Sequence, residues 1–199
     1  MNAWQTTLRR VCVAGLWCLA MAAVPAQAAP TYWSGSGHWY EPVYVGTSGI
    51  TWTAARDAAV AKGGYLACIT LAAENDFVYG LISDDTFWNL GWGYGPWLGG
   101  YQYDKLAEPA GHWAWLSPEP WGYTNWQSGQ PDDWRGAEDR LHFFNSGGGK
   151  SQMWNDQSDV PFAEVYGYVV EYVPEPSVLV LLGMGAVTLL LYAWRRRRG

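Results

Sequence analysis

Cysteine is scarce in this sequence, and its scarcity excludes two kinds of structure. The chain has three cysteines, of which Cys12 and Cys18 fall in an apolar segment near the N-terminus. If that segment is removed, Cys68 stands alone and can form no internal disulfide. A zinc site built on several cysteines is excluded for the same reason. We expect Cys68 to be a small residue of the core.

Lysine and arginine are also few, and they are unevenly placed. Of the 12 basic residues, Arg9, Arg10 and the run from Arg195 to Arg198 lie near the chain ends. Residues 29 to 172 therefore hold 6 basic and 17 acidic residues, which is a net charge of −11. A middle segment this acidic argues against a nucleic-acid partner.

Histidine offers no metal-binding pattern either. The three histidines are isolated from one another and from cysteine, so the sequence gives a zinc site little support. They are His38, His112 and His142. We expect solvated or structural roles for them.

The N-terminus has the pattern of a secretory signal peptide. Arg9 and Arg10 precede an apolar run from Val11 to Val24, and the small residues Ala26 and Ala28 follow. The run is too short to span a membrane comfortably, which disfavours the alternative of a first membrane helix. We expect a signal peptide over residues 1 to 28 and export of the remaining chain.

The C-terminus combines three features in order. Pro174-Glu175-Pro176 precedes an uncharged apolar run from Val178 to Trp194, and four arginines follow, which places that end in the cytoplasm. Residues 173 to 199 resemble the PEP-CTERM sorting signal of Gram-negative bacteria that make exopolysaccharide. The resemblance implies a transient inner-membrane anchor, cleavage by an exosortase, and a final place at the cell surface or in the extracellular matrix. A permanent single-pass anchor is the alternative.

The sequence of residues 29 to 172 predicts one domain built from short strands and two helices. Residues 37 to 45 predict a strand that tolerates a sheet edge because of Pro42. Thr51 can cap a helix that ends before Gly63-Gly64, and apolar pairs four residues apart predict a second helix over residues 72 to 82. Short strands are expected at residues 66 to 70, 97 to 100 and 164 to 172. The long tryptophan-rich segment between them lacks periodicity, and such a segment in a compact domain indicates a functional loop.

Oxygen-bearing side chains are concentrated between Trp126 and Asp156. Calcium takes about six to eight oxygen ligands, and amide carbonyls combined with carboxylates satisfy it while limiting the accumulated negative charge. The residues that offer this mixture are Gln130, Asp132, Glu138, Asn155 and Asp156. We predict that they bind Ca²⁺.

The order of motifs along the domain resembles the C-type lectin-like domain over residues 37 to 172. The residues that carry the resemblance are Trp52, Ala55, Ala59, Gly63-Gly64, Leu66, Glu74, Phe77, Trp97-Leu98-Gly99-Gly100, Asn125-Trp126, Gln130-Pro131-Asp132, Glu138-Asp139, Trp154-Asn155-Asp156 and Glu171. The resemblance implies an α+β fold with two helices flanking small antiparallel sheets, paired end strands and a long loop that binds calcium and sugar. It also implies a cis peptide bond before Pro131, which would aim Gln130 and Asp132 to the same side.

The triplet Gln130-Pro131-Asp132 resembles the galactose-binding members of this family, and Trp134 follows it as it does there. The resemblance implies that the five calcium ligands also contact the sugar and that Trp134 stacks on the apolar face of galactose. Core packing is the alternative for Trp134 in so aromatic a chain. The expected function is calcium-dependent carbohydrate binding with a galactose-type preference.

The chain departs from the family at its disulfides. Aligning the motifs puts Ala59 and Val170 at one missing bridge, where an apolar contact could substitute, and Arg140 and Asp159 at the other. We predict an Arg140–Asp159 ion pair, although an exposed pair contributes only about 0 to 1 kcal/mol against about 2 to 4 kcal/mol for a disulfide. Order in the long loop should therefore depend more heavily on the metal.

A second calcium site is a further option that the sequence leaves open. Asp133, Glu138 and Asp139 could contribute to it, with Asp104 and Glu108 completing the ligand set. The register of Asp104 and Glu108 matches the family poorly.

Two other functions remain open. One is a structural or protein-binding module that keeps the fold without binding sugar, although retention of all five ligand types argues against it. The other is a hydrolase in which Glu138 and Asp156 act as paired carboxylates. Carboxylates that coordinate a metal are poor groups for proton transfer, so we expect no enzymatic activity.

Overall fold

The computed structural model describes residues 28 to 160 and 164 to 174, together with residues 185, 187, 192 and 194 to 196. The signal peptide expected over residues 1 to 28 lies outside this part of the chain apart from Ala28, and so does most of the apolar run expected to span a membrane. The parts of the chain that the structure describes contain no helix with the length and apolarity needed to cross a membrane.

The first helix forms where its capping residues predict it. Helix α1 (Trp52–Ala61) begins after Thr51, whose side chain accepts a hydrogen bond from the backbone N–H of Ala54 at 3.2 Å. It ends at Lys62, and Gly63 then takes a φ of +85°, which glycine adopts without steric cost. Its inner face buries the predicted residues Trp52, Ala55 and Ala59.

The second helix, α2 (Ala72–Leu81), ends one residue before the end of the predicted range. It buries two polar side chains beside Val78. Each of them has a partner inside the domain. Tyr40 donates a hydrogen bond to Glu74, and Asn75 Oδ1 accepts one from the indole N–H of Trp154 at 2.8 Å. Hydrogen bonds thus tie α2 to two strands, through Tyr40 on one side and Trp154 on the other.

The strands pair into one sheet within the described residues. Its order is β1-β2-β8-β4-β6-β7, with β3 paired to β8 and β5 paired to β4, and every pair is antiparallel except β4 with β8. The strands are β1 (Thr31–Trp33), β2 (His38–Tyr44), β3 (Tyr65–Leu66), β4 (Tyr94–Gln102), β5 (Trp113–Trp115), β6 (Arg140–Phe144), β7 (Trp154–Gln157) and β8 (Gly167–Tyr172). The one-turn 3₁₀ segments η1 (Asp85–Phe87) and η2 (Trp134–Gly136) lie in connections.

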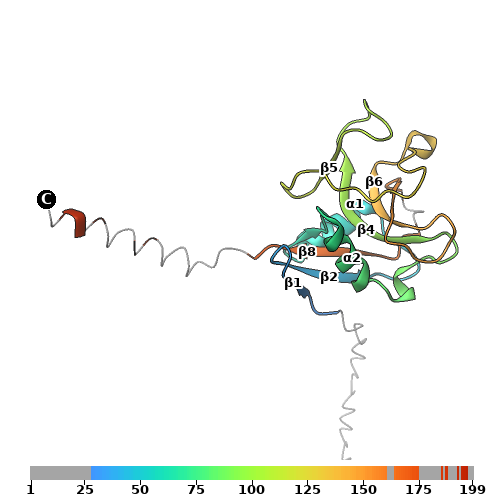
Figure 1. Cartoon of the computed structure of the whole chain (residues 1–199). Coiled ribbons are helices and arrows are strands. Elements are labelled where there is room, and N and C mark those ends of the chain that lie inside the picture. The colour runs from blue at the N-terminus through green and yellow to red at the C-terminus, as the bar shows by residue number, and fades with distance from the viewer. Residues whose placement is uncertain are drawn as a thin grey trace, which may run out of the picture.

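The two end strands, β2 and β8, pair from Trp39 opposite Tyr172 to Tyr44 opposite Gly167, as expected. Strand β2 is flanked by β1 only as far as Tyr40, so the ladder beyond that point tolerates Pro42. Figure 1 shows β1, β2 and β8 at the end of the domain from which the chain leaves, and β5 and β6 at the opposite end. The two helices and the sheet confirm the α+β prediction.

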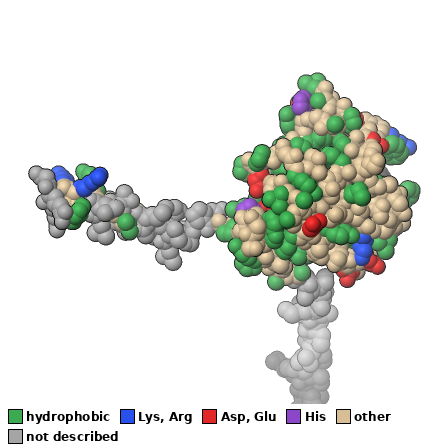
Figure 2. All heavy atoms as spheres, viewed as in Figure 1, with side chains coloured by type: hydrophobic (Ala, Val, Ile, Leu, Met, Phe, Trp, Pro, Cys, Tyr) green, Lys and Arg blue, Asp and Glu red, His purple; other side chains and the backbone are tan. Residues whose placement is uncertain are grey.

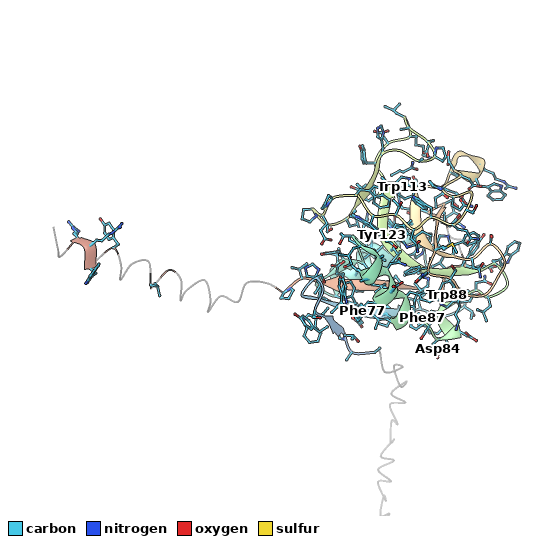
Figure 3. The ribbon with its side chains drawn as sticks, in the orientation of Figure 1. Phe77, Asp84, Phe87, Trp88, Trp113 and Tyr123 are labelled. Carbon is cyan, nitrogen blue, oxygen red and sulfur yellow. The ribbon has the colours of Figure 1, made fainter. Side chains whose placement is uncertain are left out.

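The core is strongly aromatic, and Trp154 lies at its centre. This fully buried indole makes edge contacts with Trp115, Tyr123 and Trp126 at centroid distances of 5.8, 5.4 and 6.0 Å. Figure 3 shows Trp113 and Tyr123 higher in the domain than Phe77, which α2 carries, and Trp88. Aromatic packing of this kind fixes a segment that has little regular structure.

The positions of the missing disulfides have different substitutes. Ala59 and Val170 are fully buried in one apolar cluster, which matches the expected contact. The predicted Arg140–Asp159 ion pair is wrong. The guanidinium of Arg140 lies 4.7 Å from the ring centroid of Trp52 and pairs with Asp139 at 3.4 Å, whereas Asp159 accepts hydrogen bonds from Thr53 at the start of α1. Asp159 therefore binds the N-terminus of α1 and Arg140 packs on an indole face, instead of pairing with each other.

Cys68 is fully buried and carries a free thiol, which confirms its predicted role as a small core residue. Burial raises the pKa of this thiol above its ordinary value. Its backbone N–H donates to Glu171 Oε2 at 2.8 Å.

Candidate functional site

The loop from residue 126 to residue 138 is pinned to strand β7 at its start. Trp126 bridges to Trp154, and the backbone N–H of Gln127 donates to the carbonyl of Trp154 at 2.9 Å. The Gln130–Pro131 peptide bond is cis, as expected. The backbone then turns through left-handed conformations at Asp133, with φ of 46°, and Arg135, with φ of 62°. The strand therefore delivers Asn155 and Asp156 directly beside the loop that carries the other predicted ligands.

The carboxylate of Asp156 organises this loop. It is fully buried and accepts backbone N–H bonds from Asp132 at 3.1 Å and Asp133 at 2.8 Å. Farther along, Glu138 Oε2 accepts from the backbone N–H of Trp134 at 3.2 Å, and Asp133 Oδ1 accepts from that of Glu138 at 3.0 Å. Each carboxylate thus holds a turn of the loop and keeps lone pairs for another partner.

Four of the five predicted ligands line one hollow, and the fifth, Asp156, lies close to two of them. Carboxylate oxygens of Asp132, Glu138 and Asp156 lie within 4.8 Å of one another. Gln130 and Asn155 join Asp132 and Glu138 in lining a hollow of about 230 Å³, which we call the acidic hollow. Gln130 Oε1 and Asn155 Oδ1 are buried there, and neither accepts a hydrogen bond from any described residue. Buried oxygens without donors are costly unless a ligand satisfies them, so this donor set fits a hard cation such as calcium.

Ionisation of the carboxyl groups at the hollow is unfavourable in the absence of a cation. Burial, and next the charge of Asp156, raise the pKa of Glu138 to about 8. Burial likewise raises the pKa of Asp156 to about 6, against the lowering effect of its backbone N–H bonds. A cation among these carboxylates would favour their ionised forms.

His142 orients the amide of Asn155, one of the predicted ligands, and the sequence did not reveal this role. It is fully buried on β6 opposite Asn155, and burial lowers its pKa to about 3, so the ring is neutral. Its Nε2 can then accept the hydrogen bond from Asn155 Nδ2, at 3.1 Å. Because the amide nitrogen is engaged there and with the carbonyl of Asp156, the amide oxygen stays available to the hollow.

Trp134 stands at the rim with 58% of its surface exposed, so the core-packing alternative is wrong. The guanidinium of Arg135 covers one face of the indole, with its carbon 4.0 Å from the ring centroid. Trp134 lines both the acidic hollow and an adjoining one of about 330 Å³ that includes Arg135 and Val160. An exposed indole beside polar ligands is suited to the apolar face of a sugar.

Four residues that sequence reasoning did not assign to the site also line the acidic hollow. They are Trp92, Tyr94, Phe144 and Gln157. Gln157 could have been found from the strand period, because it lies two residues after Asn155 on the same face of β7. The aromatic residues come from distant segments, and nothing in their local sequence indicates their destination.

The residues considered for a second calcium site do not assemble. Among the described residues, neither group able to hold a metal includes Asp104, Glu108 or Asp139. Asp104 instead pairs with His112 and accepts the backbone N–H of Leu106 at 2.9 Å. Asp139 pairs with its neighbour Arg140.

The second group able to hold a metal lies at the opposite end of the domain and joins His38, Glu119 and Glu171. His38 has the structural role that was one of the two expected for it, since its Nδ1 lies 2.5 Å from Glu171 Oε1. Glu171 is fully buried and also accepts hydrogen bonds from Tyr40 and from the backbone of Cys68. Protein donors already satisfy this carboxylate, so the arrangement is a structural network.

Known proteins show the same architecture. The human C-type lectin domain family 10 member A is 33% identical over 116 residues, an alignment covering 55% of this chain and 30% of that protein. The solved structure of the C-type lectin CEL-I from Cucumaria echinata is 29% identical, with a TM-score of 0.53, covering 74% of this chain and 99% of the other. Herring type II antifreeze protein matches at a TM-score of 0.56 and 19% identity, covering 76% of this chain and all of the other, and shows the fold alone. The chain spans about a third of the length of the first curated relatives that it matches.

Fold and relatives together define a C-type lectin-like domain. A PEP-CTERM protein-sorting motif matches residues 173 to 198, immediately after β8. The chain therefore combines a C-type lectin-like fold with a C-terminal PEP-CTERM sorting motif. Its relatives are lectins and lectin-like binding proteins rather than enzymes.

Proposed function

We propose that this protein binds carbohydrate in a calcium-dependent manner, with a preference for galactose-type glycans. The observation that carries the proposal is a cluster of three carboxylates, two of which line the same hollow as two buried amide oxygens that lack donors. The residues that would hold the ion are Gln130, Asp132, Glu138, Asn155 and Asp156. Calcium, when bound, supplies positive charge and open coordination positions that two vicinal sugar hydroxyls can fill.

The residues around the hollow would bind and orient the sugar. The remaining lone pairs of Asp132 and Glu138 can accept hydrogen bonds from sugar hydroxyls, while the amide nitrogen of Gln130 can donate one. Trp134 would lie against the apolar face of the ring, since one indole face is held by Arg135 and the rest is exposed. This pairing of a polar edge with an apolar face suits galactose, whose ring C–H groups cluster on one side.

We also propose a route and a destination. The PEP-CTERM motif supports export and processing by an exosortase, with a transient anchor in the inner membrane of a Gram-negative bacterium. The lectin-like domain would then act at the cell surface or in the exopolysaccharide matrix. Basic side chains are sparse on the face shown in Figure 2, which agrees with a carbohydrate ligand rather than a nucleic acid.

A lectin-like module without sugar binding is the second candidate. It is favoured by the shared fold of the herring antifreeze protein. Four of the five predicted ligands line one hollow, and a carboxylate oxygen of Asp156 lies within 4.8 Å of those of Asp132 and Glu138, which favours the first proposal.

Chromatography of the purified protein on immobilised galactose separates the two. We expect retention with calcium, release by a chelator, and no retention of Asp132→Asn. The matched control is Asp57→Asn, which changes an exposed aspartate on α1 far from the hollow. Retention that is indifferent to calcium would overturn the mechanism, and calcium binding without retention would favour the second candidate.

A further inference from the structure

The acidic hollow has a second exposed tryptophan on its wall. Trp92 is 65% exposed, more than Trp134, and it lines the same hollow as Gln130, Asp132 and Glu138. It comes from the connection before β4, about forty residues earlier in the chain than Trp134. Burying an exposed indole on a ligand removes a large apolar area from water.

The backbone that carries Trp92 is held firmly. A tight turn brings Asn89 and Tyr94 together as a bridge, and the N–H groups of Trp92 and Gly93 both donate to the carbonyl of Asn89, at 3.1 and 2.7 Å. Gly93 has a φ of +72°, and a Cβ there would lie 1.9 Å from the carbonyl oxygen of Asn145. The turn is therefore locked against the neighbouring loop, and Trp92 is presented on an ordered support.

The ring of Trp92 is also held by a neighbouring aromatic ring. It stacks on Tyr94 with a centroid distance of 6.4 Å and an interplanar angle of 21°. Tyr94 packs in turn against Phe144 at 5.8 Å, so three aromatic rings form one wall of the hollow. A preorganised aromatic platform binds with little loss of side-chain freedom.

The acidic hollow is smaller than a site that encloses a whole small ligand. Its volume of about 230 Å³ lies below the roughly 300 to 1,000 Å³ of sites that enclose a whole small ligand. The adjoining hollow of about 330 Å³ shares Tyr94, Trp134 and Gln157 with it. A ligand seated at the acidic residues would therefore continue past the rim.

We infer that Trp92 is the platform for a second sugar residue and that the site accommodates a neutral glycan chain of at least two residues. This inference rests on the proposed function, because it assumes that the first sugar sits at the acidic residues. An anionic chain is disfavoured because residues 29 to 172 carry a net charge of −11 and Arg135 is the only basic residue lining either hollow among the residues described. A linear neutral polysaccharide segment meets these requirements.

The test compares galactose with a linear galactotetraose by titration calorimetry on the full chain in calcium. We expect the wild type to bind the tetraose about five- to tenfold more tightly than galactose. Trp92→Ala should remove this advantage, because it should lower the affinity for the tetraose about five- to tenfold more than the affinity for galactose. Trp92→Phe, which keeps an aromatic ring, should retain part of it. Trp39→Ala is the matched control, because Trp39 is an exposed tryptophan on β2 outside both hollows.

Each outcome separates this inference from the proposed function. Equal binding of galactose and tetraose by the wild type, unchanged in Trp92→Ala, would overturn the extended site and leave the proposed function standing. Equal loss of both ligands in Trp92→Ala would place Trp92 in the first sugar site and overturn the inference. Failure of the wild type to bind either ligand would overturn the proposed function itself.

Discussion

Calcium binding to the acidic hollow should release protons, and their number follows from the structure. Burial raises the pKa of Glu138 to about 8 and that of Asp156 to about 6. As a coupled pair, the two carboxyls then carry about one proton at pH 7 and about two at pH 5. Calcium takes the ionised carboxylates, so its binding must displace those protons.

The same values set the pH dependence of affinity. Around pH 7, where about one proton is displaced, the apparent association constant for calcium should rise about tenfold per pH unit. The rise should be steeper at pH 5 and nearly level above pH 9, where Glu138 is already ionised. Sugar binding that depends on calcium should follow the same curve.

Stability should respond with opposite signs in the two states. Without calcium, burial favours protonated Glu138, whose folded pKa lies above its ordinary value. Its contribution to stability is therefore present in acid and is lost as the pH rises through about 8. Because calcium favours the ionised form, the increase in Tm on adding calcium should become larger between pH 6 and pH 8.

Isothermal titration calorimetry at pH 7 in two buffers of different ionisation enthalpy counts the released protons. We expect about one proton per calcium for the wild type and about a tenth of a proton for Glu138→Gln, which keeps the shape but cannot ionise. No proton release by the wild type, together with an affinity that is constant from pH 5 to pH 9, would refute the assignment of the buried pair to the calcium site.

Three further predictions concern the domain as a whole. Chelation of calcium should speed tryptic cleavage at Lys105 and Arg135, because the long loop lacks a disulfide; equal rates with and without calcium would contradict this coupling. Trp154→Phe removes the indole N–H bond to Asn75 and should lower the free energy of unfolding by about 1 to 3 kcal/mol, measured by urea titration. Burial raises the pKa of Glu171 to about 7, so the wild type should lose Tm between pH 5 and pH 8.5, and Glu171→Gln should lose less; parallel curves would show that another group titrates.

Much of this protein can be read from local sequence. The bounds of α1 follow from Thr51 and Gly63, because caps act within a turn of the residues that they terminate. The cis peptide bond before Pro131 follows from the resemblance, and Gln130 and Asp132, which flank this proline, need no distant partner to be close. The pairing of the end strands and the α+β class follow from the order of the motifs.

Other predictions failed because they depended on competition among distant groups. Arg140 and Asp159 stand at matching positions in the sequence, but they do not pair in the folded domain. Arg140 lies over the face of Trp52, and Asp159 accepts a hydrogen bond from the first turn of α1. The sequence also indicated no partner for His38, and the pairing of β2 with β8 brings it beside Glu171. Sequence spacing carries no information about such contacts across strands.

The sequence alone determined which atoms could bind calcium; the tertiary structure decided whether they meet. Pairing of β6 with β7 sets Asn155 opposite His142, and burial there leaves the asparagine oxygen without a donor. Burial also raises the pKa values of Glu138 and Asp156, and the turn at Gly93 brings Trp92 to the rim. These properties arise from desolvation and from long-range packing, which exist only once the chain has folded.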